Sequence, residues 1–314
     1  SGSRALWLSG SPTLWLPGSL ALWLPGSLAL DRRSPQPPTM ASGHIDGWDD
    51  PGQGEREQLV GQETPLNDLE RSERDWALYL RPRELKDFCK PRGCMSLRMF
   101  LFFRGSVALY FIAITIYSLV KTWQDTPDGP WWPIYLTNWT LFLVIAYFSC
   151  AWTSSFYYST NLDGIREAPK LIKATWVLQN IASSVVMLVF LVYWLLMWDW
   201  KTVNFEGISV HLMNFAAIIV DRIYSCAPMR IRHVYMPIAF LAVYGLFAII
   251  QDYSNLDNGS IEGTAIYAIT DFKQRPELAW PTVAALFFVL TPLNHVFMCI
   301  LASKSGKYLS KHQT

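Results

Sequence analysis

Long apolar runs are the feature that most constrains the fold of this chain. A helix needs about 20 mainly apolar residues to cross ~30 Å of hydrocarbon. The runs lack the two-residue alternation of transmembrane barrel strands, and helices satisfy their own backbone groups in lipid. The sequence therefore predicts an all-α, polytopic membrane protein with about six transmembrane helices. The expected spans are residues 99–121, 134–157, 175–198, 209–228, 234–252 and 281–303.

Charge is distributed unevenly and divides the chain into four parts. Only 16% of the residues are charged, against about 25% in soluble domains, and most charges precede residue 100 or lie between apolar runs. Residues 1–39 repeat the units LWLSGSPT, LWLPGSLA and LWLPGSLA before the first methionine, Met40, so we expect a low-complexity upstream extension without a function. We expect a polar cytosolic tail over 40–97, a six-helix transmembrane domain over 98–303 and a basic cytosolic tail over 304–314.

Lysine and arginine residues gather in alternate connections and predict the orientation. They are frequent before the first span, between the second and third, around the fourth-to-fifth turn and after the sixth. Because cytoplasmic loops carry the excess of positive charge, both termini should be cytosolic, in the plasma membrane or the endoplasmic reticulum. The sequon Asn258-Gly-Ser260 then lies in the last outer loop and is the glycosylation candidate. A second sequon, at Asn138, lies just inside a span, where we expect no glycan.

Several classes of function find no support in the sequence. The net charge is only +1 and no nucleic-acid-binding signature is present, so no nucleic-acid partner is expected. Cys89 and Cys94 form a lone pair that cannot complete a four-ligand zinc site. His233 and His295 could approach the geometry of two haem ligands, but no further pair supports a haem protein. We therefore expect neither a metal nor an organic cofactor.

Two polar residues at one predicted depth form the candidate catalytic site. Thr137 lies three residues past the outer start of its span, and His211 lies two residues past the outer start of its own. At one level, the imidazole could act as general base for a threonine nucleophile. Asn214, at i+3 from His211, should share its helix face and orient the imidazole or stabilise an oxyanion. The alternative is structural, because a membrane Thr commonly bonds its own i−4 carbonyl and a membrane His commonly bonds a neighbouring helix.

Charged residues nearer the cytosolic side are expected to have structural roles. Arg104 lies more than one turn inside the inner face, and its long side chain should extend to the lipid headgroups. Asp221 and Arg222 lie at the cytosolic end of the 209–228 span, where a salt bridge or a positioning role is expected.

Four short motifs connect the chain to a known family. They are Leu101-Phe-Phe-Arg-Gly105, Tyr135-Leu-Thr-Asn-Trp139, His211-Leu-Met-Asn214 running to Asp221, and Ile266-Tyr267 leading through Pro276 to Trp280-Pro281. On these motifs the chain resembles the rolling stone family, within the broader group of androgen-induced membrane proteins, over about residues 98–303.

The resemblance implies two different functions. Rolling stone is associated with myoblast fusion in insects, as an integral membrane component. The broader group includes threonine hydrolases that cleave fatty-acid esters of hydroxy fatty acids, and the motif match places their Thr and His on Thr137 and His211. One hypothesis is therefore a membrane-embedded hydrolase whose partners are membrane lipids and a fatty-acid ester substrate. The other is a non-enzymatic protein of cell adhesion or fusion, in which the same two residues are interhelical hydrogen-bond partners.

Overall fold

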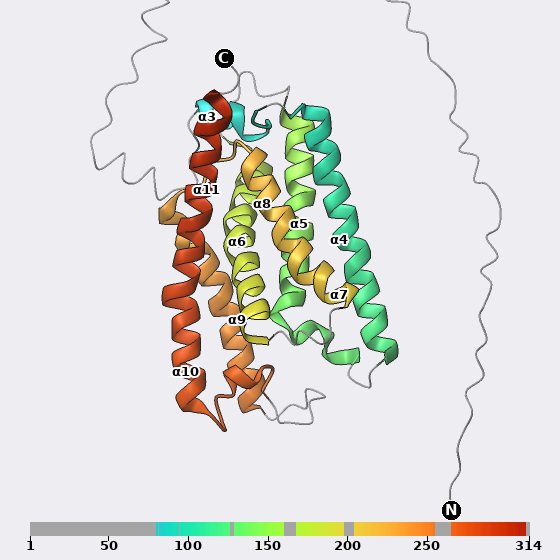
Figure 1. Ribbon diagram of the computed structural model, residues 1–314, viewed down its shortest axis with the longest axis vertical. Coiled ribbons are helices and arrows are strands. Elements are labelled where there is room, and N and C mark those ends of the chain that lie inside the picture. The colour runs from blue at the N-terminus through green and yellow to red at the C-terminus, as the bar shows by residue number, and fades with distance from the viewer. Residues whose placement is uncertain are drawn as a thin grey trace, which may run out of the picture. The chain divides into compact units, whose positions relative to one another are not determined.

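The computed structural model is an α-helical bundle (Figure 1). It describes residues 80, 82–93, 95–125, 129–159, 168–197, 204–254 and 265–311. The expected upstream extension over 1–39 and the glycosylation candidate Asn258 lie outside the described residues.

Five long helical stretches of the described residues are apolar enough to cross a membrane. Each overlaps one of the predicted spans, which confirms an all-α, integral membrane protein. Two stretches continue through wider π-helical turns, and one is preceded by a 3-10 turn. Their elements are α4 (Leu97–Asp125), α5 (Leu136–Tyr158), α6 (Lys170–Val192) with η2 (Tyr193–Met197), η4 (Ile231–Val234) with α9 (Tyr235–Tyr253), and α10 (Pro276–Ala285) with η6 (Leu286–Leu290) and α11 (Thr291–Lys311).

The remaining predicted span, 209–228, corresponds to a more polar helical segment. It consists of α7 (Phe205–Gly207), the π-helical η3 (Ile208–Met213) and α8 (Asn214–Tyr224), which follow one another directly. This segment is not among the helices that qualify as spans by length and composition. The predicted count of about six transmembrane helices therefore stays a prediction.

Helix α6 lies at the centre of the bundle, where it contacts α5, α8, α9 and α11. Helix α4 packs on α5 and turns large apolar side chains outward, such as Phe102, which is 77% exposed, and Leu109, which is 69% exposed. Apolar surface of this kind is stable against lipid, and large contiguous patches of it are rare on soluble monomers. The outward face of the bundle thus matches its assignment to a membrane.

The bundle has two distinct ends. At the α3 end, the short helix α3 (Pro82–Phe88) packs Leu85 and Phe88 against Trp176 of α6. Burial raises the pKa of the neighbouring Cys89 thiol to about 12. At the α10 end lie the 3-10 turns η1 (Gly129–Ile134) and η5 (Ala268–Thr270), with the start of α10 (Figure 1).

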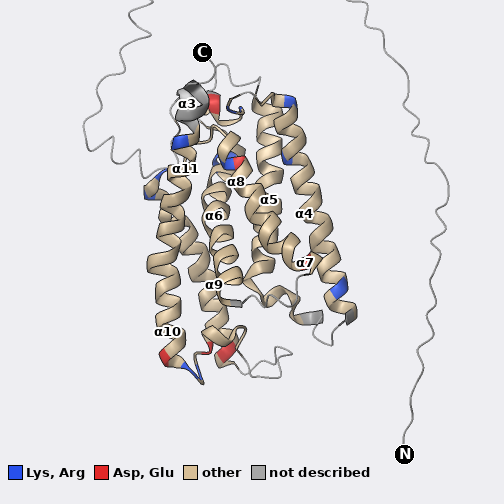
Figure 2. Cartoon of the chain, in the orientation of Figure 1, with Lys and Arg blue, Asp and Glu red and all other residues tan. Residues whose placement is uncertain are grey.

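Positive charge distinguishes the two ends (Figure 2). Among the described lysines and arginines, eight lie by sequence at helix ends or turns of the α3 end: Lys90 and Arg92 after α3, Arg98 in α4, Lys170 and Lys173 in α6, Arg230 and Arg232 at η4, and Lys304 in α11. Lys121, near the last turn of α4, and Lys273 and Arg275, before α10, lie toward the α10 end.

A buried ion pair joins α4 to α8 in the half of the bundle nearer the α3 end. Arg104 Nε lies 2.8 Å from Asp221 Oδ1, and both side chains are almost fully buried. Arg104 also donates to the hydroxyls of Ser155, at 2.6 Å, and Ser225, at 3.3 Å, while the Tyr147 hydroxyl donates to Asp221. The expectation that Arg104 extends to the headgroups is wrong, because an acidic partner is available at its own depth.

Arg222 adds a second positive charge to this cluster. Its Nη2 lies 3.7 Å from Asp221 Oδ2, and its side chain is equally buried. The salt-bridge role expected for Asp221 and Arg222 is therefore confirmed, with Arg104 as the closer partner. The Asp221 carboxylate thus forms ion pairs with two buried guanidinium groups.

His295, considered above as a haem ligand, is hydrogen-bonded through both ring nitrogens. Its Nδ1 lies 2.9 Å from Ser184 Oγ on α6, and its Nε2 lies 3.0 Å from the Arg230 carbonyl oxygen. His233 lies against the Trp176 ring, with 4.9 Å between ring centroids. Ser184 and His295 therefore join α6 to α11 in the bundle interior.

Candidate functional site

A pocket of about 550 Å³ opens inside the bundle toward the α10 end. Its walls come from the end of α4, the start of α5, the end of α6, the α7–η3 segment, α9, the residues around η5, and α10 with η6. Most of the lining side chains are aliphatic or aromatic, with a few polar groups among them. A largely apolar pocket with a small number of placed polar groups is the usual form of a small-molecule site.

Thr137 reaches this pocket from the second residue of α5. The first amides of a helix have no partner within the helix, and here the Leu136 N–H donates to the Tyr267 hydroxyl at 2.9 Å. The residue four positions before Thr137 is Pro133, which lies in η1 before the helix. Within the described part of the chain, the Thr137 hydroxyl has no hydrogen-bond partner.

His211 lines the same pocket from the π-helical turn η3. Its ring stacks on that of Tyr193, with centroids 3.4 Å apart and an angle of 10° between the planes. The buried Nδ1 atom has no hydrogen-bond partner among the described residues. The stacking holds the His211 ring in a fixed orientation at the pocket wall.

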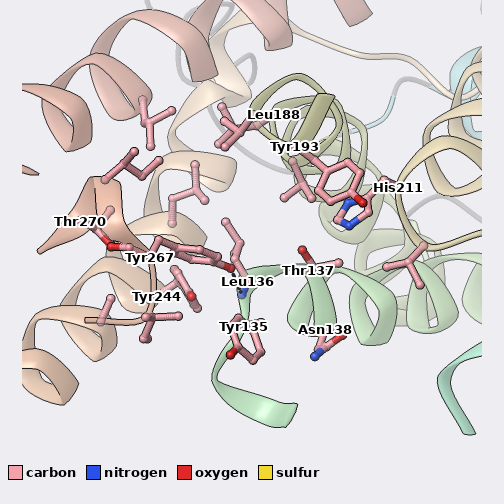
Figure 3. Close-up of a pocket in the computed structure, with 18 of the residues that line it drawn as sticks. Tyr135, Leu136, Thr137, Asn138, Leu188, Tyr193, His211, Tyr244, Tyr267 and Thr270 are labelled. Carbon is pink, nitrogen blue, oxygen red and sulfur yellow. Dashed lines mark hydrogen bonds between the residues drawn. The ribbon is translucent and has the colours of Figure 1, made fainter. Parts of the chain in front are cut away.

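Thr137 and His211 lie on the same side of the pocket, and Tyr244, Tyr267 and Thr270 lie on the other (Figure 3). No hydrogen bond joins the Thr137 hydroxyl to His211 among the described residues. The two side chains therefore share a pocket without forming a preassembled pair.

Asn214 lies apart from this pocket. It is the first residue of α8, is buried, and is not among the residues that line the pocket. Its backbone N–H donates to the His211 carbonyl, and its side-chain Oδ1 has no partner among the described residues. The π turn explains the difference from the expected shared face, because it is wider than an α turn and shifts the register after His211.

Wide turns recur around the pocket. Tyr193 belongs to η2, His211 to η3, and Phe287 to η6, and all three residues line the pocket. In η6 the Thr291 N–H reaches back five residues to the Leu286 carbonyl, which also accepts from the Thr291 hydroxyl at 2.7 Å. Single π turns inside α-helices are found frequently at functional sites.

Two tyrosines that sequence reasoning did not assign hold the start of α5 in place. The Tyr244 hydroxyl donates to the Ile134 carbonyl at 2.9 Å, and the Tyr267 hydroxyl accepts from the Leu136 N–H. Burial raises the pKa of Tyr267 to about 12, so its hydroxyl stays protonated at neutral pH. Tyr267 belongs to one of the family motifs, which is the only signal in the sequence that could have indicated it.

An ion pair between Lys121 and Glu206 lies beside the pocket, at the end of α4. The Ser118 hydroxyl donates to Glu206, and Lys121 Nζ lies 3.2 Å from Glu206 Oε2. Trp132 Nε1 donates to Ser118 at 3.1 Å and connects this group to η1. Asn138, whose sequon was not expected to carry a glycan, is buried and donates its side-chain amide to the Trp132 carbonyl.

Comparison with known proteins gives one distant relationship. No family model matches the chain, and no solved structure matches it. The chain is 24% identical over 210 residues to protein rolling stone of Drosophila melanogaster, an alignment that covers 61% of this chain and 73% of that protein. With its apolar helical bundle, the chain is therefore a rolling stone-like integral membrane protein, at a distant level of similarity.

Proposed function

We propose that this protein is a membrane-embedded hydrolase of a lipid ester, with Thr137 as nucleophile and His211 as general base. The observation that carries the proposal is the position of both side chains on one side of a largely apolar pocket. Both residues line that pocket, and neither the Thr137 hydroxyl nor the buried His211 Nδ1 has a partner within the described part of the chain. A nucleophile and a base are recognised by such geometry rather than by sequence position.

The proposed reaction has two steps. The Thr137 oxygen attacks the ester carbonyl while His211 takes the hydroxyl proton, and the C–O bond to the alcohol breaks as His211 returns that proton to the leaving oxygen. Water, deprotonated by His211, then attacks the acyl-threonine ester. The bond between the acyl carbon and the Thr137 oxygen breaks, His211 returns the proton to that oxygen, and the fatty acid is released. Thr137 lies in the first turn of α5, where the helix dipole favours a developing negative charge.

Asn214 has a supporting role in this proposal. It follows η3 directly, and its backbone N–H donates to the His211 carbonyl, so we assign it the positioning of η3. No cofactor is needed for these steps. The proposed partners are membrane lipids and the ester substrate itself.

The proposed orientation places the α3 end in the cytosol. The described lysines and arginines are more frequent there, as expected for the cytoplasmic side. Both termini would then be cytosolic and the pocket would lie near the outer interface of the plasma membrane or the endoplasmic reticulum. At that depth the acyl chains of a lipid stay in hydrocarbon while the ester group reaches water.

Covalent labelling with a fluorophosphonate probe tests the proposal. The full chain is expressed in membranes as wild type, Thr137→Ala and His211→Ala, with Thr270→Ala as a matched control from the opposite side of the same pocket. We expect both site variants to lose labelling by about 100-fold or more, while the control labels like the wild type. Labelling of Thr137→Ala at the wild-type level, or no labelling of folded wild-type protein, would overturn the proposal.

The alternative implied by the family resemblance is a non-enzymatic membrane protein of cell adhesion or myoblast-fusion-type processes. In that case the wild type would not label, and substitutions at Thr137 and His211 would change only stability. The outer loops would then carry the interaction with a partner.

A further inference from the structure

The lining of the pocket is polar on one side and apolar on the other. Helix α4 and the start of the α7 segment contribute the polar side chains Ser118, Thr122, Asn204 and Glu206. Helices α9 and α10, with η6, contribute Leu241, Gly245, Ala248, Val283, Leu286 and Phe287. None of these six side chains carries a charge or a hydrogen-bonding group. Helix α9 also contributes Tyr244, whose hydroxyl already donates to the Ile134 carbonyl at 2.9 Å. The pocket is therefore built for a ligand with unlike ends.

The polar side is a poor place for hydrocarbon. Glu206 already accepts from Ser118 and pairs with Lys121, and this pair is partly exposed to solvent. Covering it with an acyl chain would remove water from two charges without replacing their hydration. The apolar side has no such penalty, and each methylene buried there strengthens binding by about fourfold.

Gly245 lies where α9 comes close to η6. A Cβ atom at this position would lie 3.3 Å from Cζ and 3.7 Å from Cε2 of Phe287. Gly245 lies in the middle of α9 with helical backbone geometry, and the one glycine with a positive φ among the described residues is Gly93. Since glycine weakens a helix relative to alanine, what Gly245 provides here is space beside Phe287.

We propose that the apolar side of the pocket, between α9 and η6, is an acyl-chain site, and that Gly245 and Phe287 together limit the length of chain it accepts. The site takes the hydrocarbon tail of a fatty acid or of its ester. The chain would extend from the carbonyl group at Thr137 past Leu241 toward Phe287, with the alcohol part of an ester toward Glu206. The hydrolytic part of this inference rests on the proposed function, whereas acyl-chain binding does not.

Chain-length selectivity tests the proposal. The full chain in lipid nanodiscs is assayed with p-nitrophenyl butyrate, octanoate and palmitate as wild type, Gly245→Val and Phe287→Ala. We expect Gly245→Val to reduce kcat/KM for palmitate at least tenfold and for butyrate less than twofold, because the added side chain occupies the far end of the site. Phe287→Ala should raise the palmitate-to-butyrate ratio, and the double variant should recover most of the loss caused by Gly245→Val.

Gly105→Val is the matched control. It places the same side chain on α4 against Trp152, and Gly105 is not among the residues that line the pocket. This control should leave the chain-length ratio unchanged, and Gly245→Ala, a smaller addition, gives an intermediate case. An equal loss for all three esters in Gly245→Val, or an unchanged ratio, overturns the inference while the hydrolase proposal stands.

Fatty-acid binding separates this inference from the hydrolase proposal. Displacement of fluorescent parinaric acid by saturated fatty acids of 8, 12 and 16 carbons is measured on wild type and Gly245→Val. We expect the wild type to prefer the longest acid and the variant to lose that preference, even if no ester is hydrolysed. A wild type that binds no fatty acid would overturn the acyl-chain site.

Discussion

In the buried cluster around Asp221, the polar groups are paired with one another, whereas two polar groups of the pocket, the Thr137 hydroxyl and His211 Nδ1, are not. Asp221 accepts hydrogen bonds from Arg104 and Tyr147, and Arg104 also bonds two hydroxyls. In the pocket, the buried His211 Nδ1 and the hydroxyl of the half-buried Thr137 have no partner among the described residues. A buried polar group without a partner costs stability, so each one in a folded protein calls for an explanation.

The difference separates two roles for polar residues inside a membrane bundle. A paired cluster such as Arg104 with Asp221 fixes the relative position of α4 and α8, and removing one partner leaves a charge uncompensated. Groups that face an open volume, such as Thr137 and His211, can instead bond to a ligand. Substitutions should therefore affect stability in the first region and labelling or turnover in the second.

The largest expected effect concerns the hydroxyl of Thr137. Thr137→Val keeps the shape of the side chain and removes the oxygen, so probe labelling should fall by about 100-fold or more. The midpoint of thermal unfolding should change little, because this hydroxyl has no partner to lose. Thr137→Ser retains the oxygen and should keep most of the labelling. A large fall in the unfolding midpoint of the Val variant would mean that Thr137 belongs with the structural group.

The next effect concerns the buried carboxylate. Asp221→Ala leaves Arg104 and Arg222 buried without an acidic partner and should lower stability by about 3–5 kcal/mol. The matched control is Glu206→Gln in the partly exposed pair with Lys121, where about 0–1 kcal/mol is expected. Both are measured by unfolding in detergent. Equal free energies of unfolding for the Asp221 and Glu206 variants would contradict the proposed difference between the buried cluster and the pocket.

A smaller effect is expected from Tyr267, whose hydroxyl joins the residues around η5 to the start of α5. Tyr267→Phe removes the acceptor for the Leu136 N–H at the start of α5 and should lower stability by about 1 kcal/mol. It should also reduce labelling of Thr137, because Thr137 is the residue that follows Leu136. Tyr253→Phe, at an exposed tyrosine of α9, is the control and should be neutral. Unchanged labelling in Tyr267→Phe would limit that residue to a structural role.

The smallest effect belongs to the hydrogen bond between α6 and α11. Ser184→Ala removes the partner of His295 Nδ1 and should cost about 0.6 kcal/mol, the average for interhelical hydrogen bonds in a membrane. Labelling should be unchanged, because Ser184 is fully buried and is not among the pocket residues. Loss of labelling comparable to that of His211→Ala would instead identify Ser184 and His295 as the reacting pair.

The helices could be predicted from the sequence because hydropathy is a local property. The predicted run 134–157 differs from α5, Leu136–Tyr158, by no more than two residues at either end. The partner of Arg104 could not be predicted in this way, because Asp221 is 117 residues away and a sequence does not state which helix faces which. Arginine alone is compatible with extension to the headgroups, and only the packing of α8 beside α4 decides otherwise.

The candidate site could be predicted in part. Counting residues from the outer ends of their spans placed Thr137 and His211 at similar depth, and both line the pocket. The i+3 spacing predicted that Asn214 shares the helix face of His211, and this prediction assumes an α turn. The structure has a π turn there, which no simple periodicity of the sequence indicates. Tyr267 lies after residues 255–264, which the structure does not describe, so its proximity to α5 depends entirely on tertiary structure.

The wide turns η2, η3 and η6 bear on which one-codon deletions the helices can tolerate. In an ordinary helix, deleting one codon rotates everything after it by about 100° and disrupts the packing of the whole segment. A π turn already holds an additional residue, so a one-codon deletion there can return the turn to α geometry with both ends of the helix still in register. Of the three turns, η3 and η6 lie between helical segments, and one-codon deletions there would reshape the pocket wall and spare the rest of the bundle.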